Sequence, residues 1–234
     1  MICPNCRSEL YFLLENNGRI LKCRKCGHEG PYIKPNYSSY HDDRYKYSFV
    51  RNEKNDPLIN KIISVMGFSK NDRVLDYGCG AGDLSNAINK YSKNIIGIDI
   101  NIKVAREKYT SIKFVKQKNK KINFPDNSFD KIVAVNVIEH VPDYLFLLSE
   151  FERVLVKGGE LFITSYDKYF ILHSILNDPT HVIEWNMDEF KTLIENKFEV
   201  KNYFKYGSFF NYRMINRLIV KVLKPELCIF ARKR

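Results

Sequence analysis

A glycine-rich segment, residues 74–82, carries the strongest chemical signal in the chain. It reads Val-Leu-Asp-Tyr-Gly-Cys-Gly-Ala-Gly, an apolar run that closes on Asp76 and is followed by three alternating glycines. Glycine is needed where the backbone adopts a positive φ, or where a ligand lies directly against it. A second apolar run, residues 94–100, places Asp99 23 positions after Asp76, where Rossmann-type sheets hold ribose hydroxyl groups. The pattern predicts a nucleoside site at the ends of two neighbouring strands.

This segment resembles motif I of the class I S-adenosylmethionine-dependent methyltransferases, an acid-x-Gly-x-Gly-x-Gly loop. It fits the dinucleotide pattern G-x-G-x-x-G poorly, because the glycines alternate and Asp76 precedes them. A carboxylate at that point would repel a pyrophosphate but tolerate the cationic methionine end of S-adenosylmethionine. Over roughly residues 55–200, the chain also resembles the type 11 subfamily, through F-P-D-N-S-F-D, I-V-A-V-N-V-I-E-H-V and V-L-V-K-G-G-E-L-F-I-T.

The resemblance implies a role for each residue of the cofactor site. The glycines would let the backbone approach the amino acid moiety, Asp76 would hold the methionine ammonium group through water, and Asp99 would bind both ribose hydroxyl groups. For Asp99, an ordinary acid at a strand-end turn is the alternative. Asn136 would place its backbone carbonyl near the methylsulfonium. Family members usually carry an acid for the adenine amino group, but residues 115–119 have none, so Gln117 or backbone contacts and apolar packing would replace it. The expected cofactor-binding residues are Asp76, Gly78, Cys79, Gly80, Gly82, Asp99, Ile100, Gln117 and Asn136.

Two histidines are the candidates for a general base. Methyl transfer needs an aligned nucleophile, and a base helps when that nucleophile is a hydroxyl group or a protonated amine. His140 follows a predicted strand at 131–137. His181 closes an Asp-Pro-Thr-His segment after the predicted strand 160–165, near the strand ends where substrates enter such sheets. The alternatives are structural: a hydrogen-bonded loop residue for His181, and a helix start or pocket wall for His140.

Four cysteines near the start of the chain predict a second chemistry. They form two Cys-x-x-Cys pairs separated by sixteen residues: Cys3, Cys6, Cys23 and Cys26. Two such turns can present four thiolates tetrahedrally, as in a structural zinc ribbon. An Asn-Gly turn within residues 10–22 favours a β-hairpin between them. Disulfides are the alternative, which a cytosolic setting disfavours.

The order of elements predicts a doubly wound, Rossmann-like α/β sheet of seven strands. A helix is expected to begin at Asp56-Pro57 and end at Gly67, another spans residues 144–155 with Gly158-Gly159 as its stop, and Asn186 with Glu189 predicts a capping box. A further helix is possible near residues 214–223.

The resemblance adds that the seventh strand inserts antiparallel between the fifth and the sixth. We expect a zinc ribbon at 1–32, a connector at 33–54 and a methyltransferase domain at 55–234. The expected strands cover residues 73–77, 94–100, 112–116, 131–137, 160–165, 198–206 and 227–231.

Charge and hydropathy limit the partners. The 234 residues carry a formal net charge of +11, with five lysines and no acid between residues 113 and 121. Such basicity favours a nucleic-acid or anionic partner, although a solvated lysine-rich face gives the same composition. No apolar run approaches the roughly 20 residues that span a bilayer, and the first residues lack the shape of a signal peptide, so a cytoplasmic protein is expected.

Three functions are compatible with these features. The first is methyl transfer to a small molecule or to a saccharide or lipid intermediate, and the second is methylation of RNA. A zinc ribbon ahead of this fold resembles the large-subunit ribosomal RNA guanine methyltransferases, but Asn136-Val-Ile-Glu139 replaces the N-P-P-Y-like motif used for exocyclic amines. The third is a non-catalytic interaction protein, which the intact glycines and Asp99 disfavour.

Overall fold

The computed structural model describes residues 10–15, 18–23, 29–32, 56–168, 181–206 and 226–234. Its first sheet is a small antiparallel one in the order β1-β2-β3, formed by β1 (Leu10–Glu15), β2 (Gly18–Cys23) and β3 (Glu29–Tyr32). The first two strands are the expected hairpin, with Glu15 opposite Gly18. The third strand was not foreseen.

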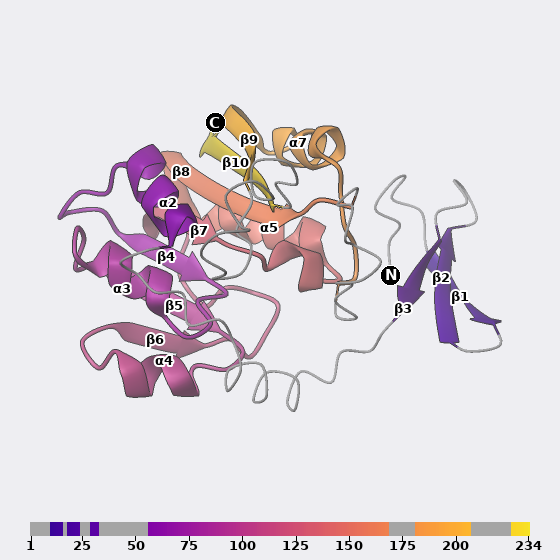
Figure 1. Cartoon of the computed structure of the whole chain (residues 1–234), viewed down its shortest axis with the longest axis horizontal. Helices are drawn as coiled ribbons and strands as arrows, with labels where there is room; N and C mark the ends of the chain where they lie inside the picture. Colours follow the sequence, from indigo (N-terminus) through magenta and orange to yellow (C-terminus); the bar gives the residue numbers. More distant parts are fainter. Residues whose placement is uncertain (1–9, 16–17, 24–28, 33–55, 169–180, 207–225) are drawn as a thin grey trace, which may run out of the picture.

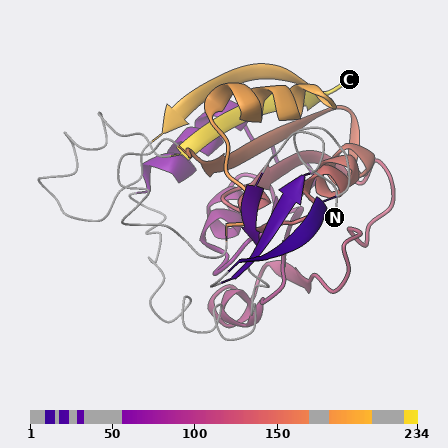
Figure 2. The same ribbon diagram turned by 90° about the vertical axis from the view of Figure 1, so that its right-hand side faces the viewer.

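The second sheet has seven strands in the order β6-β5-β4-β7-β8-β10-β9. It runs from β6 near the bottom of Figure 1 to β9 and β10 near the top. Strands β4 to β8 pair in parallel, whereas β10 is antiparallel to both of its neighbours, β8 and β9 (Figure 2). This confirms the predicted fold class and the antiparallel insertion of the last strand. The strands are β4 (Val74–Tyr77), β5 (Ile95–Asp99), β6 (Lys113–Lys116), β7 (Phe129–Ala134), β8 (Leu155–Tyr166), β9 (Phe198–Tyr206) and β10 (Glu226–Lys233).

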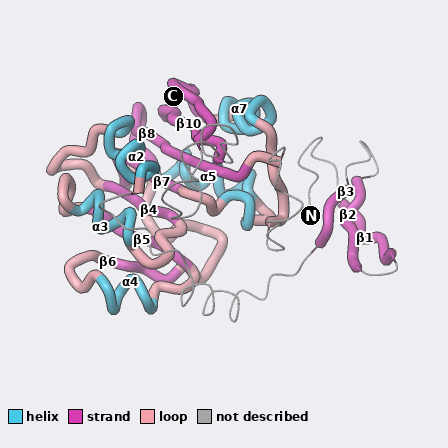
Figure 3. Tube along the Cα trace, in the orientation of Figure 1, coloured by secondary structure: helices cyan, strands magenta, loops and turns pink. Residues whose placement is uncertain are grey.

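Helices alternate with these strands along the chain and cover both faces of the sheet (Figure 3). They are α2 (Pro57–Met66), α3 (Asp83–Asn89), α4 (Lys103–Lys108), α5 (Tyr144–Val154) and α7 (Met187–Glu195), with a short 3₁₀ helix, η1 (Ile138–His140). One apolar cluster packs α2, α3 and α4 against one face, and a second packs α5 and α7 against the other. Neighbouring residues of a central strand therefore enter opposite cores, as Ile132 and Val133 do.

Helix α2 forms as its sequence predicts. The Asp56 side chain accepts hydrogen bonds from the backbone amides of Leu58 (2.8 Å) and Ile59 (3.3 Å), and Pro57 occupies the first turn, where its missing N–H costs nothing. Gly67 ends the helix with φ +54°. The capping box expected at Asn186 and Glu189 is also present at the start of α7.

The expected boundaries between α5 and β8 and at the end of β7 differ from those of the structure. Helix α5 ends at Val154, and Leu155 already pairs with Phe129 as the start of the twelve-residue strand β8. Gly158 therefore lies inside a strand, with φ +75°, and does not stop the helix. Strand β7 ends at Ala134, three residues before the predicted end, because the chain turns at Asn136 into η1.

Other expectations fall outside the described residues. These are the connector at 33–54 and the possible helix near 214–223. Within the part of the chain that the structure describes, no helix has the length and apolar character needed to cross a membrane.

Candidate active site

The glycine loop lies between β4 and α3 and adopts the backbone conformation that its sequence predicts. Gly78, Gly80 and Gly82 have φ values of +77°, +54° and +84°, a region that other residues enter only at a cost. The backbone amides of Gly78 and Cys79 both donate to the carbonyl oxygen of Ile98, at 2.7 and 3.0 Å. The loop is thus anchored to the end of the neighbouring strand β5.

Packing restricts two of these positions as well. A Cβ atom added at Gly78 would lie 2.0 Å from Cγ2 of Val137, and one added at Gly82 would lie 2.9 Å from Cζ of Phe114. The close approach that the sequence predicted at these glycines therefore includes protein side chains. Val137 belongs to the segment after β7, so the loop and that segment are in direct contact.

Both predicted acids are buried at the carboxyl ends of their strands. Asp76 is 2% exposed and accepts a hydrogen bond from Ser85 Oγ at 2.6 Å. Asp99 is 8% exposed, and its two carboxylate oxygens accept from the backbone amides of Gly80 and Asn101, each at 2.9 Å. Asp99 therefore fixes the glycine loop to β5, a bracing role that the sequence did not predict.

Cys79 lies in the same loop but is unsuited to nucleophilic chemistry. Its thiol is buried, and burial together with the nearby carboxylates of Asp76 and Asp99 raises its pKa well above the ordinary value. A thiol held in its neutral form is a poor nucleophile. Cys79 is therefore a small buried residue of the loop.

Ile100 and Gln117 border the end of β5. Ile100 is one of the few exposed large apolar side chains of the described chain. The backbone amide of Gln117 donates to the carbonyl oxygen of Asp99 at 2.8 Å, and its side-chain amide donates to the carbonyl oxygens of Asn119 (2.7 Å) and Lys121 (3.2 Å). Gln117 thus shapes the lysine-rich loop after β6 and keeps its side-chain oxygen as an acceptor.

Asn136 occupies an unusual position two residues beyond β7. Its φ is +53°, which is uncommon for a residue other than glycine. Its backbone amide donates to Thr164 Oγ1 at 3.0 Å, the Thr164 hydroxyl donates back to its Oδ1 at 2.7 Å, and its Nδ2 donates to Glu226 Oε1 at 3.2 Å. The side chain therefore joins the segment after β7 to β8 and β10.

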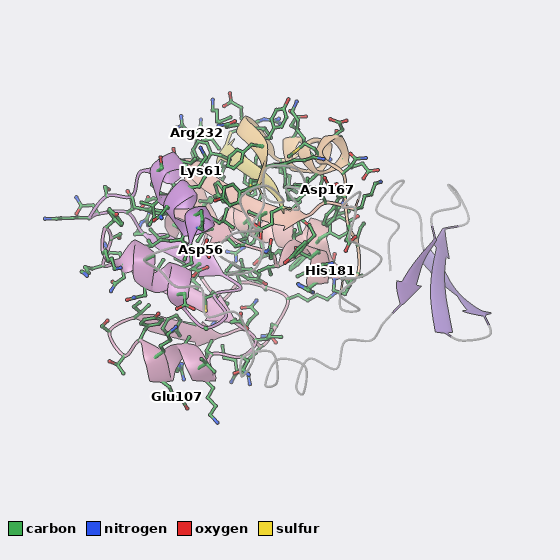
Figure 4. The ribbon with its side chains drawn as sticks, viewed as in Figure 1. Asp56, Lys61, Glu107, Asp167, His181 and Arg232 are labelled. Atoms are coloured by element: carbon green, nitrogen blue, oxygen red, sulfur yellow. The ribbon has the colours of Figure 1, made fainter. Side chains whose placement is uncertain are left out.

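The structure brings the two predicted histidines together. The rings of His140, in η1, and His181, which is labelled in Figure 4, lie with their centroids 4.8 Å apart. Nδ1 of His181 is hydrogen-bonded to Oε1 of Glu184. Val182 N donates to the backbone oxygen of Glu139 at 2.7 Å, which holds the segment after residue 180 against η1.

Glu139 is the main residue that sequence reasoning missed. It is 0% exposed, and burial, reinforced by the negative charges of Glu226 and Glu184, raises its pKa to about 8. Its backbone and the neighbouring Ser165 hydroxyl lower the pKa by less than burial raises it. The available signal was the acid beside a histidine in Ile-Glu-His, directly after a strand.

The predicted zinc ligands lie mostly outside the described residues. Cys3, Cys6 and Cys26 belong to segments that the structure does not describe, and Cys23 is described only as the last backbone position of β2. The zinc ribbon thus stays a prediction.

Comparison with known proteins shows what this part of the chain is similar to. Residues 75–163 match the family described as methyltransferase domain. Over this segment, about 38% of the chain, the protein is similar to that family. A solved S-adenosylmethionine-dependent methyltransferase from Aquifex aeolicus superposes with a TM-score of 0.63 at 21% identity, covering 83% of this chain and 98% of that one.

Curated relatives match part of the chain in sequence. Sterol 24-C-methyltransferase of Pneumocystis carinii is 34% identical over 125 residues, which cover 49% of this chain and 33% of that protein. Demethylmenaquinone methyltransferase of Staphylococcus aureus is 29% identical over 180 residues, which cover 66% of this chain and 74% of that protein. The chain thus spans about a third of the first relative's length. S-adenosylmethionine is the general cofactor of the methyltransferase family to which the domain is matched.

Proposed function

We propose that this chain is an S-adenosylmethionine-dependent methyltransferase with a small-molecule acceptor, such as a saccharide or lipid intermediate. One observation carries the cofactor assignment: Asp99, buried at the tip of β5, is held by the backbone amides of Gly80 and Asn101. A carboxylate fixed in this way needs no reorganisation when a ligand with a ribose diol arrives.

The residues at this edge of the sheet fit the predicted cofactor. The positive-φ loop of Gly78, Gly80 and Gly82 would receive the amino acid moiety, and the buried Asp76 would balance its ammonium group. Gln117 would accept from the adenine amino group through its side-chain oxygen, beside the exposed Ile100. Asn136 would offer its backbone carbonyl, since its side chain is bound to Thr164 and Glu226. The cofactor itself would supply a methyl group on a sulfonium, a very good leaving group.

The acceptor would meet His140 and His181. A hydroxyl or ammonium acceptor loses a proton as it is methylated, and an imidazole nitrogen at hydrogen-bonding distance can receive it. Because His181 Nδ1 is bound to Glu184, its Nε2 atom would be the receiving position. Both relatives are named for small acceptors, a sterol and a demethylmenaquinone, which supports this substrate class.

The cofactor assignment is tested by calorimetric titration with S-adenosylhomocysteine. Replacing Asp99→Asn removes the charged acceptor and is expected to weaken binding by about tenfold or more, since hydrogen bonds to charged groups contribute about 1.5–3 kcal/mol. Asp126→Asn, which changes an exposed acid, is the matched control and is expected to bind as the wild type does. Circular dichroism monitors the fold, because Asp99 also braces Gly80. Equal affinity in Asp99→Asn would place the ribose elsewhere, and a wild type that binds nothing would leave a non-catalytic interaction protein.

The acceptor class is tested with tritiated cofactor and fractionated cell extract. Label in the small-molecule fraction is the expected result, and label in RNA would overturn the small-molecule proposal. A gel shift with total RNA at low and high salt reports whether the lysines of residues 113–121 hold a polyanion, since phosphate contacts weaken steeply with salt.

We also propose that the chain is organised as a zinc ribbon at 1–32, a connector at 33–54 and a methyltransferase domain at 55–234. The β1–β2 hairpin supports the first unit, because it brings the end of β2 at Cys23 opposite Leu10, four positions after Cys6. Four thiolates would close a structural zinc site, so this metal would not take part in methyl transfer.

A further inference from the structure

A cluster of metal-ligating side chains adjoins the predicted cofactor site. Glu139, His140 and His181 each offer one ligand atom, and these atoms all lie within 4.8 Å of one another. Glu139 and His140 are consecutive in η1, whereas His181 comes from the segment before α7. Backbone hydrogen bonds hold the two segments together: Val182 N and Ile183 N both donate to the carbonyl oxygen of Glu139, at 2.7 and 3.4 Å.

The carboxylate of Glu139 is the unusual member of the cluster. It is completely buried, and neither of its oxygens has a hydrogen-bond partner of standard geometry among the described residues, although its own backbone and the Ser165 hydroxyl lie close enough to lower its pKa. Two further carboxylates, Glu184 and Glu226, act on it with the same sign of charge. Buried carboxylates in proteins are generally paired with a cation or coordinate a metal, because an isolated one is costly. A cation bound beside Glu139 would offset the negative charge of its carboxylate.

His181 is oriented as a metal ligand would be. Its Nδ1 atom is hydrogen-bonded to the carboxylate of Glu184, and in the ring tautomer that carries its proton on Nδ1, Nε2 is the atom available as a ligand. Metal-binding histidines almost always donate their other ring N–H to a carboxylate, a carbonyl or water, which fixes the ring and raises the basicity of the ligand nitrogen. Glu184 would be such a positioning residue.

We propose that Glu139, His140 and His181 bind one divalent transition-metal cation. Two imidazoles and one carboxylate form a ligand set for Zn²⁺, Fe²⁺, Mn²⁺ and Co²⁺, and three protein ligands leave positions open for a further molecule. A cation at about 2.0–2.2 Å from each donor would draw the three atoms to about 3.4 Å from one another. The residues His140 and His181 are half-buried, but Nε2 of His181 is itself buried, so binding of an ion would require these side chains to rotate.

The location gives the cation a use in catalysis. Val137, in the same turn as Glu139, packs against Gly78 of the glycine loop, so the cluster and the predicted cofactor site share a border. If the proposed function holds, an acceptor oxygen would take an open position on the cation, which would polarise it and make its proton easier to lose. His140 and His181 would then act as ligands, and the acceptor's proton would pass to solvent. Metal binding itself does not depend on the proposed function.

Metal counting on the full-length protein tests the proposal. The protein is stripped with a chelator, dialysed against Co²⁺ and analysed for bound metal per chain. Glu139→Gln, which keeps the shape of the side chain, is expected to lose one equivalent relative to the wild type. Glu195→Gln, an exposed acid of α7, is the matched control and is expected to lose none. Equal metal content in the wild type and Glu139→Gln would overturn the proposal.

Two further readouts separate this site from the cysteines and from the cofactor. Co²⁺ bound to cysteine thiolates has its own absorption bands. If Glu139→Gln loses Co²⁺ from the proposed site, these bands are expected to be the same as in the wild type. Glu184→Gln is expected to keep the site but weaken its Co²⁺ affinity by about 10–100-fold, as loss of an outer carboxylate does. An unaltered affinity would contradict the role given to Glu184. Titration of the same samples with S-adenosylhomocysteine tests the proposed function independently, and Glu139→Gln is expected to bind it as well as the wild type.

Discussion

At the scale of single residues, the contact between Gly78 and Val137 shows how the glycine loop and the turn after β7 restrict each other's conformation. The loop needs a positive φ at Gly78, and Val137 fills the space where a side chain would stand. The turn that carries Val137 also carries Asn136, whose φ is +53°. Such unfavourable backbone conformations persist only where the surroundings hold them, here through Thr164 and Glu226.

Replacing Gly78→Ala is expected to destabilise the protein through two separable effects. The positive φ costs about 1–2 kcal/mol for a residue with a Cβ atom, and the overlap with Val137 adds about 1–3 kcal/mol. Gly67→Ala is the matched control, because Gly67 has φ +54° and nothing within 4 Å of an added Cβ atom. Urea unfolding measures both variants, and the loss is expected to be larger at Gly78.

The double variant Gly78→Ala/Val137→Ala isolates the overlap. Removing the valine methyl groups is expected to recover about 1–3 kcal/mol of the loss at Gly78. Additive effects of the two substitutions would mean that the close contact carries no energy, and the backbone alone would explain the cost.

Residue-scale prediction succeeded where a local rule applies and failed where burial decides. The alternating glycines and the acid at the tip of β5 are dictated by backbone conformation and strand order, so their positions could be read from the sequence. The burial of Glu139 could not, because an acid in a chain is expected at the surface and only tertiary packing covers it. The bracing of Gly80 by Asp99 likewise depends on contacts between residues 19 positions apart.

At the scale of elements, helix α5 is tied to the preceding loop by a charged pair. Arg153 binds Glu150 through two hydrogen bonds of 2.8 Å and also donates to the carbonyl oxygens of Ile122 and Phe124. Ile122 N donates to the same Glu150 carboxylate at 2.8 Å. The hydrogen bonds from Arg153 are the largest cause of the lowered pKa of Glu150. Burial raises this pKa, and the hydrogen bond from the Ile122 amide lowers it further.

This pair predicts a pH dependence of stability. Because the folded-state pKa of Glu150 is below its ordinary value of 4.5, its contribution is fully present above that value and is lost as the pH falls through the folded-state pKa. Glu150→Gln is therefore expected to lower the free energy of unfolding by about 1.5–3 kcal/mol at pH 7, with a difference that shrinks below pH 4.5. Urea unfolding of both proteins at pH 7 and at several pH values below 4.5 measures this difference. A difference that stays constant with pH would contradict the charged contribution.

Element boundaries followed the sequence where caps mark them. Helix α2 begins and ends where Asp56, Pro57 and Gly67 predict, since each of these acts locally. The start of β8 was missed because Leu155 is placed by its pairing with Phe129, a contact between distant residues that overrides the helical pattern of α5. Glycine at position 158 was read as a helix stop, although a glycine with positive φ also fits inside an irregular strand.

At the scale of the whole molecule, the chain combines two chemistries that can be tested separately. Residues between Leu58 and Ala231 build apolar cores on both faces of the seven-stranded sheet. The predicted zinc site uses only cysteines of residues 3–26. A domain with its own core is expected to keep its fold and its ligand affinity when a separate module is lost.

Replacing Cys23→Ser tests this independence. The substitution removes one of the four predicted thiolates, and it is expected to release one equivalent of zinc while the affinity for S-adenosylhomocysteine stays within about twofold of the wild type, because structural zinc stabilises only the module that it closes. The control is Cys228→Ser, which changes a buried cysteine of β10 outside the predicted ligand set and is expected to keep its zinc. Metal analysis and calorimetry on the same preparations give both quantities. If Cys23→Ser loses zinc and cofactor affinity together, the two units are coupled, and the division at residues 33–54 does not describe how the molecule works.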